Sequence, residues 1–94
     1  MDPMKTSYEF YNEAVRLRQN IFDGTTNLTP VMAWAMVCRA CANAENAHRR
    51  QMAEAKQTFA HRSDLSFFNN LDSIHWYAKA QVEYHAKKNI VANA

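Results

Sequence analysis

The sequence predicts an all-α protein: a three-helix bundle built on a long antiparallel helical hairpin, with a shorter N-terminal helix packed against it. The chain has one glycine, Gly24, and its last proline is Pro30, so no helix-breaking residue occurs from residue 31 to residue 94. Nine alanines, which favour helix, lie between residues 33 and 60. Apolar residues recur at helical spacing, without the alternation that is typical of strands.

The first helix is predicted over residues 6–22. Thr6 and Glu9 form a capping box, in which each side chain satisfies a backbone N–H at the start of the helix. The apolar stripe of this helix consists of Phe10, Ala14, Leu17 and Ile21, widened by Tyr11, Val15 and Phe22. Gly24 is expected to end the helix, because glycine adopts the left-handed conformation of a C-cap at low cost.

The second helix is predicted over residues 30–62 without interruption. It begins at Thr29-Pro30, a hydroxyl cap followed by proline at the first helical position, where the missing N–H has no consequence. Residues 31–44 begin with a stretch that is apolar on every face, so we expect this half to be buried on all sides. Residues 45–62 are more polar and basic, with a narrow apolar stripe, and we expect any binding surface to lie there.

The third helix is predicted over residues 64–90, with Ser63-Asp64 as its cap. Phe67 and Phe68 are expected to lie in a short helical turn, and Asn69-Asn70 in a break before the main helix. The core stripe of the main helix is expected to consist of Leu71, Ile74, Ala78, Val82 and His85. A chain of 94 residues with one such set of helices makes a single domain, residues 1–94.

The composition excludes several classes of protein. The chain is 48% hydrophobic and has a net charge of +2, so it has enough apolar residues for a core and is not predicted to be disordered. It has no run of about 18 apolar residues, which a membrane-spanning helix needs, and residues 1–10 lack the apolar stretch of a signal peptide. We therefore expect a cytoplasmic protein with no membrane partner and with reduced cysteines.

Two cysteines and two histidines are candidates for a metal site. Cys38 and Cys41 lie one turn apart on the second helix, a workable pair of zinc ligands. His75 and His85 of the third helix are the residues available to complete such a site. In the alternative interpretation, the cysteines are small core residues, since free cysteine is among the most often buried residue types. We prefer this interpretation and predict no bound metal and no cofactor, with these four residues as the weak candidates for ligands.

The sequence contains little evidence for catalytic activity. Glu45 and His48 are three residues apart, a spacing found in carboxylate-bridged iron sites of helical bundles. The same spacing occurs in an ordinary polar pair on one helix face, and we prefer this second interpretation. No nucleophile elbow, phosphate-binding glycine loop or zinc-protease motif is present. A single glycine also leaves little material for a catalytic loop. We therefore predict that the chain is not an enzyme.

The remaining function is recognition of another macromolecule. We predict a small non-enzymatic protein-binding module, a regulator, inhibitor or adaptor of the kind found among compact phage and bacterial regulatory proteins. Trp76 lies off the core stripe and is the preferred anchor, because aromatic residues dominate the energetics of interfaces. The partner-binding candidates are Arg49, Arg50, Met52, Lys56, Phe59, Arg62, Phe67, Phe68 and Trp76.

The sequence is also compatible with two other functions. The second helix has a local excess of positive charge, so the chain could be a weakly basic helical nucleic-acid-binding protein. The residues that give this excess are Arg39, Arg49, Arg50, Lys56 and Arg62. The second helix also has a seam with the 3-4 spacing of a coiled coil, from Val31 to Phe59. A second copy of the chain could close this seam in a homodimer or a larger structural assembly.

Overall fold

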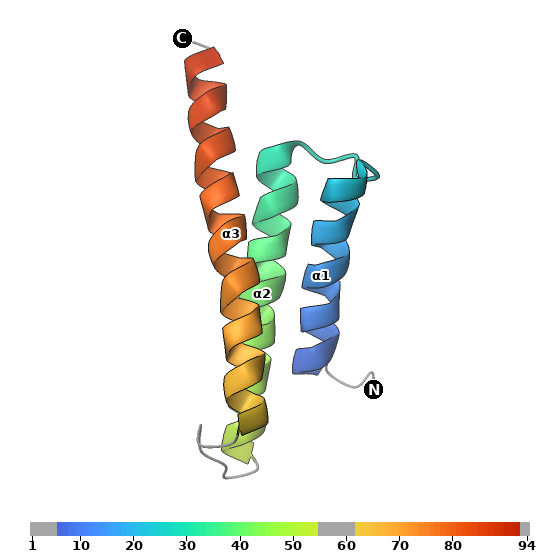
Figure 1. Ribbon diagram of the computed structural model, residues 1–94, viewed down its shortest axis with the longest axis vertical. Coiled ribbons are helices and arrows are strands. Elements are labelled where there is room, and N and C mark those ends of the chain that lie inside the picture. The colour runs from blue at the N-terminus through green and yellow to red at the C-terminus, as the bar shows by residue number, and fades with distance from the viewer. Residues whose placement is uncertain (1–5, 55–61, 93–94) are drawn as a thin grey trace.

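The protein consists of three helices that pack side by side (Figure 1). The computed structural model describes the backbone of residues 6–54 and 62–92, and the side chains of residues 6–54 and 65–88. α1 spans Ser7–Asp23, α2 spans Pro30–Glu54 and α3 spans Arg62–Ala92. Within these residues there is no strand. The predicted all-α class, with three packed helices, is therefore confirmed.

α2 lies between the other two helices. It packs against α1 and against α3, whereas α1 and α3 meet each other at few points. The chain direction alternates, so α1 and α3 run the same way and α2 runs opposite to both (Figure 1). α3 continues past the N-terminal end of α2. None of the helices, over the residues that the structure describes, is long and apolar enough to cross a membrane.

Local hydrogen bonds set both ends of α1. The Thr6 hydroxyl accepts a hydrogen bond from the backbone N–H of Glu9 at 3.2 Å, as the capping motif predicts. At the other end Gly24 has a φ of 72°, and its backbone N–H donates to the carbonyl of Ile21. This left-handed glycine is the predicted C-cap. The first helix and its two boundaries therefore follow directly from the sequence.

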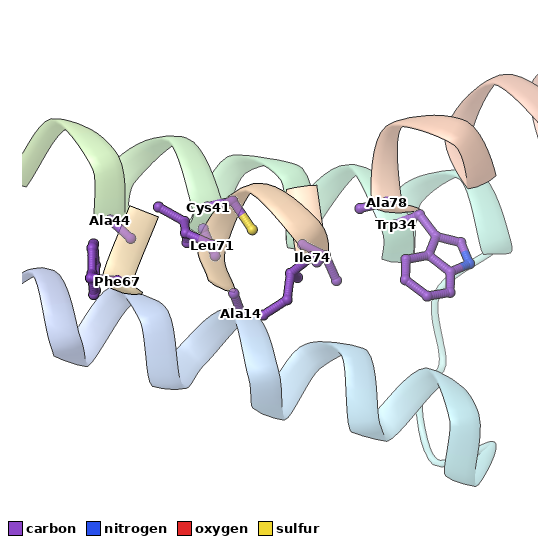
Figure 2. Packing of buried hydrophobic residues seen from close by; sticks show 10 residues of the cluster. Ala14, Trp34, Cys41, Ala44, Phe67, Leu71, Ile74 and Ala78 are labelled. Carbon is purple, nitrogen blue, oxygen red and sulfur yellow. The ribbon is translucent and has the colours of Figure 1, made fainter. Parts of the chain in front are cut away.

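The hydrophobic core forms where the inner faces of the three helices meet (Figure 2). Its buried members are Ala14 from α1, Trp34, Val37, Ala40, Cys41 and Ala44 from α2, and Phe67, Leu71, Ile74 and Ala78 from α3. Trp34 closes the core at the end near the α1–α2 loop, and Phe67 lies at the opposite end. Small side chains of α2 between these two rings let the neighbouring helices approach closely.

The distribution of buried residues along α2 differs from the prediction. Met32 and Met36 in the first half are 56% and 42% exposed, and Met36 lines an open pocket between α1 and α2. In the second half, Ala47, His48 and Met52 are buried. The prediction that residues 31–44 are buried on all sides is therefore wrong. The second half of the helix has a broader buried face than its polar sequence indicates.

α3 is one continuous helix where the sequence predicts a break. Asn69 and Asn70 lie inside it. Phe67 and Leu71 are buried on the same face, one turn apart, so contact with the core spans the two asparagines. The Ser73 hydroxyl also donates to the Asn69 carbonyl at 3.1 Å. Burial of the flanking residues outweighs the low helix propensity of asparagine.

The boundary between α2 and α3 also differs from the prediction. Arg62, predicted to end the second helix, is the first residue of α3, and Ser63-Asp64 lies inside α3. After Pro30 the sequence has neither glycine nor proline, so it gives no strong signal for the end of a helix. The helix predicted over residues 55–61 lies outside the described residues.

Candidate functional site

A furrow runs between α1 and α3, which both pack closely on α2 and meet each other at few points. Two open pockets lie along it, one towards each end of α1. We call this feature the aromatic furrow. It is lined by Tyr8, Tyr11, Arg18 and Phe22 from α1, and by Ser66, Phe67, Asn70, Ser73, Ile74 and Tyr77 from α3.

The spacing of residues explains why these side chains share one side of the molecule. On α1 the stripe that faces the furrow consists of Tyr8, Tyr11, Val15, Arg18 and Phe22. On α3 it consists of Ser66, Asn70, Ser73 and Tyr77, and Tyr84 continues it two turns later. Steps of three and four residues keep side chains on one face of a helix. Each helix therefore has a second stripe beside the one that enters the core.

Aromatic rings contact each other across the furrow at both ends. Near the start of α1, the ring of Tyr8 lies 5.2 Å from that of Phe67 on α3, centroid to centroid. At the other end, the ring of Phe22 lies 6.4 Å from that of Tyr77. The Trp34 ring of α2 contacts both, at 5.7 Å from Phe22 and 5.3 Å from Tyr77. The core therefore holds these exposed rings in fixed positions.

The rings along the furrow leave a large apolar area in contact with solvent. Phe22 is 58% exposed, and Tyr8 and Tyr77 are close to half exposed. Since an aromatic side chain buries about 150–250 Å² when it is covered, these three together present roughly 300 Å². Exposed apolar surface of a few hundred Å² is common on a monomeric protein and is often functional.

Arg18 places a positive charge among these rings. Its side chain is half-buried and lines the same pocket as Phe22 and Tyr77. Its guanidinium forms no hydrogen bond or ion pair with any residue in the described parts of the chain. The furrow therefore combines an aromatic surface with one cation that has no acidic partner among the described residues.

Two predicted partner-binding residues belong to the core instead. Met52 and Phe67 are each 5% exposed. The Phe67 ring stacks on that of His48, with centroids 4.3 Å apart, and reaches the furrow only as part of its floor. Both side chains are therefore buried within the chain, and their role in partner binding stays a prediction. On the same stripe of α2, His48 contacts Ser7 of α1 and Phe67 of α3, which the pattern of a single helix does not show.

Arg49 and Phe68, two further candidates, contact one another. The Arg49 guanidinium lies 5.4 Å from the centroid of the Phe68 ring and pairs with the Glu45 carboxylate at 2.9 Å. Phe68 is half-buried. Glu45 and His48, which the sequence suggested as a pair, have these separate contacts: Glu45 with Arg49, and His48 with Ser7 of α1.

The other basic candidates lie away from the furrow or outside the described residues. Arg50 is exposed on α2, and Arg39 is exposed where it lines an open pocket with Glu13 and Leu17 of α1. Lys56 and Phe59 lie outside the described residues, and so does the side chain of Arg62. The predicted basic surface for nucleic acid therefore stays a prediction.

Trp76 is 73% exposed, more than any other large hydrophobic residue that the structure describes. It lies on the outer face of α3, about 100° around the helix from Tyr77, and therefore outside the furrow. The Lys79 ammonium lies 5.9 Å from the centroid of its ring. The predicted position of Trp76 off the core stripe is confirmed, and its role as an anchor stays a prediction.

Cys38 and Cys41 are free thiols. Cys41 is fully buried, and burial together with the neighbouring Cys38 raises the pKa of its thiol from 9.0 to about 12. Burial also raises the pKa of Cys38. Both thiols are therefore protonated at neutral pH and pack as small hydrophobic groups. Within residues 6–54 and 65–88, no three His, Cys, Asp or Glu side chains are grouped so that they could hold a metal ion.

The two candidate histidine ligands have other surroundings. His75 is half-buried; burial and the Lys79 ammonium lower its pKa, while Glu45 and Asp72 act in the opposite direction. His85 lies further along α3, where its ring contacts that of Tyr84 at 5.1 Å. In the described part of the chain, neither histidine joins the cysteines in a ligand group.

A buried polar cluster, which the sequence does not predict, lies at the start of α1. The Ser7 hydroxyl donates to Gln51 Oε1 at 2.8 Å and lies 3.1 Å from His48 Nδ1. Since its proton goes to Gln51, the nitrogen donates to Ser7 Oγ in this arrangement. A serine beside a histidine can be an activated nucleophile, but Ser7 is fully buried, so no substrate reaches it. The cluster joins α1 to α2.

No local signal in the sequence could have found this cluster. Ser7 follows the helix cap, and its two partners lie 41 and 44 residues away. The furrow is equally non-local, because its walls come from the first and last helices of the chain. Comparison with protein-family models, with curated proteins and with solved structures finds no match to this chain. Its geometry is therefore the basis of the functional proposal.

Proposed function

We propose that the chain is a small protein-binding module and that its partner docks in the aromatic furrow. The observation that carries this proposal is the exposure of three rings that line the furrow, those of Tyr8, Phe22 and Tyr77. Aromatic side chains are enriched at interfaces, where a few of them supply most of the binding energy. The module acts as a cytoplasmic regulator, inhibitor or adaptor and performs no chemistry of its own.

The contacts beneath the rings support the same proposal. Phe22 and Tyr77 rest on Trp34, which is 3% exposed and belongs to the core. Rings held in this way lose little conformational entropy when a partner covers them, which favours affinity. Exposed apolar residues on flexible segments would lack this advantage.

The proposal also assigns a role to the longer helices. α2 and α3 form an antiparallel hairpin that acts as a stiff platform, and α1 provides the second wall of the furrow. The outer face of α2 is then the back of the module. Its exposed residues, among them Met32 and Arg50, form a solvated surface rather than a binding site.

Site-specific photocrosslinking in the native host tests this proposal. A photoreactive phenylalanine analogue replaces Tyr77 in the furrow, Trp76 on the outer face of α3, or Arg50 on the back of α2, one position at a time. Adducts are then identified by mass spectrometry. We expect a protein adduct from position 77 that is reduced several-fold by Phe22→Ala, with none from position 50.

The other outcomes contradict the proposal in distinct ways. Adducts from position 50 to nucleic acid would favour the basic alternative. An adduct from position 77 to a second copy of the chain would mean a homo-oligomer. Adducts from position 76 alone would move the binding surface to the outer face of α3. Circular dichroism of each variant shows whether the helices are retained.

A further inference from the structure

We propose that the partner presents a single amphipathic helix with a carboxylate, and that this helix lies in the aromatic furrow antiparallel to α1 and α3, with its carboxylate on Arg18. The inference rests on the proposed function, and it adds the chemistry and the orientation of the docked segment. Its grounds are the charge of Arg18, the spacing of the furrow residues and the directions of the two walls.

The charge of Arg18 requires an acidic group. The Arg18 side chain is half-buried and lines one pocket with Phe22 and Tyr77, and no acidic side chain in the described residues pairs with its guanidinium. A docked segment that covers Phe22 and Tyr77 would bury this charge further, and an unpaired buried charge is strongly unfavourable. A carboxylate from the partner removes this penalty through a charge-assisted hydrogen bond, which arginine can make in bidentate form.

The spacing of the furrow residues fits a helix rather than a strand. Both walls place side chains at steps of three and four residues, which is the pattern that interlocks with a third helix. A strand has its side chains at every second residue and would not match this spacing. The 17 residues of α1 extend over about 25 Å, so a partner helix of about 17–21 residues spans the furrow.

The orientation follows from the two walls. α1 and α3 run in the same direction, and α2 runs opposite to them. A helix antiparallel to both walls completes an up-down-up-down four-helix bundle, with each helix antiparallel to its neighbours. Arg18 lies in the C-terminal half of α1, so the matching carboxylate belongs in the N-terminal half of the docked helix.

A synthetic peptide titrated into the intact protein tests this inference. The probe is a helix of about 21 residues with leucine at the core positions of each heptad and one glutamate in its N-terminal half. Two further peptides have lysine at that position, or the glutamate moved to the C-terminal half. Isothermal titration calorimetry measures their affinities. We expect the first peptide to bind about tenfold tighter than either of the others.

Matched variants of the protein assign this preference to one side chain. Arg18→Glu is expected to weaken the glutamate peptide about tenfold and to make the lysine peptide the tighter one. Arg18→Gln should remove the preference without reversing it. Arg16 is the control, because it is exposed on another face of α1, and Arg16→Glu is expected to leave the ranking of the peptides unchanged. Circular dichroism confirms that each variant is folded.

The possible failures separate the inference from the proposed function. If all three peptides bind in the furrow with equal affinity, the proposal that the partner carries a carboxylate is wrong, but the furrow remains the docking site. Tighter binding of the peptide with glutamate in its C-terminal half would overturn the antiparallel orientation. If none of the peptides binds, the furrow does not take a helix and the inference is wrong, while the photocrosslinking still tests for a partner of another shape.

Discussion

At the first residue of α1, the Ser7 hydroxyl is a fully buried group shared by two residues of α2. We expect Ser7→Ala to lower the free energy of unfolding by about 1–3 kcal/mol, because it leaves the buried Nδ1 of His48 without this partner. Ser73→Ala is the control; its hydroxyl is exposed, and we expect a change within about 0.5 kcal/mol. Denaturant titration measures both, and equal effects would contradict the structural role of the cluster.

The buried thiol of Cys41 predicts how stability depends on alkaline pH. Its pKa in the folded protein, about 12, lies above the ordinary value of 9.0 that applies when the chain is unfolded. The unfolded chain therefore releases its proton first, so stability is unaffected by this group below pH 9.0 and falls as the pH rises towards 12. The slope is about 1.4 kcal/mol per pH unit.

Cys41→Ala isolates the contribution of this thiol from that of other groups that titrate at alkaline pH. We expect the difference in unfolding free energy between wild type and variant to be constant up to about pH 9 and to shift in favour of the variant above it. Urea titrations at pH 8, 9 and 10 provide the comparison. A difference that does not change with pH would show that the thiolate is not destabilised in the core.

Among the elements, α1 has boundaries that the sequence determines through local chemistry. Gly24 has a positive φ, and no atom lies within 4 Å of the position that a Cβ would occupy there. Gly24→Ala is therefore expected to cost about 1 kcal/mol through backbone strain alone. Gly24→Asn should cost less, since asparagine tolerates this conformation. Thermal unfolding ranks the three proteins, and an alanine variant as stable as wild type would contradict the C-cap.

α2 and α3 show what local patterns could not establish. The asparagine pair at 69–70 looked like a break, yet burial of Phe67 and Leu71 on both sides keeps α3 helical. Met32 and Met36 looked like core residues because their neighbours are apolar, but apolar sequence around a helix does not supply a neighbour to cover it. The number of helices that pack around a given helix is a property of the tertiary fold. It cannot be deduced from the pattern of apolar residues in that helix alone.

For the whole molecule, the fold class and most of the core stripes were predictable, whereas the candidate site was not. Phe22 was assigned to the edge of a core stripe, and its meeting with Tyr77 over Trp34 depends on how α1 and α3 are placed around α2. The same holds for Arg18, whose sequence neighbours do not indicate that it lacks an acidic partner. Trp76 was the exception, since its offset from the core stripe predicted its exposure.

The open side between α1 and α3 is the property of the whole molecule that the functional account depends on. Here α2 is the common neighbour, and α1 and α3 meet each other at few points. Tyr8, Phe22 and Tyr77 therefore remain exposed along the furrow. The account therefore predicts that one further helix from a partner completes the bundle.

Amide chemical-shift mapping of the isotope-labelled protein during titration with the glutamate peptide tests this central claim most directly. The account predicts perturbations along residues 8–22 and 66–84, strongest near Arg18 and Tyr77, with little change at Met32 and Arg50 on the back of α2. Perturbations centred on the back of α2 or on Trp76, with the furrow residues unchanged, would contradict it.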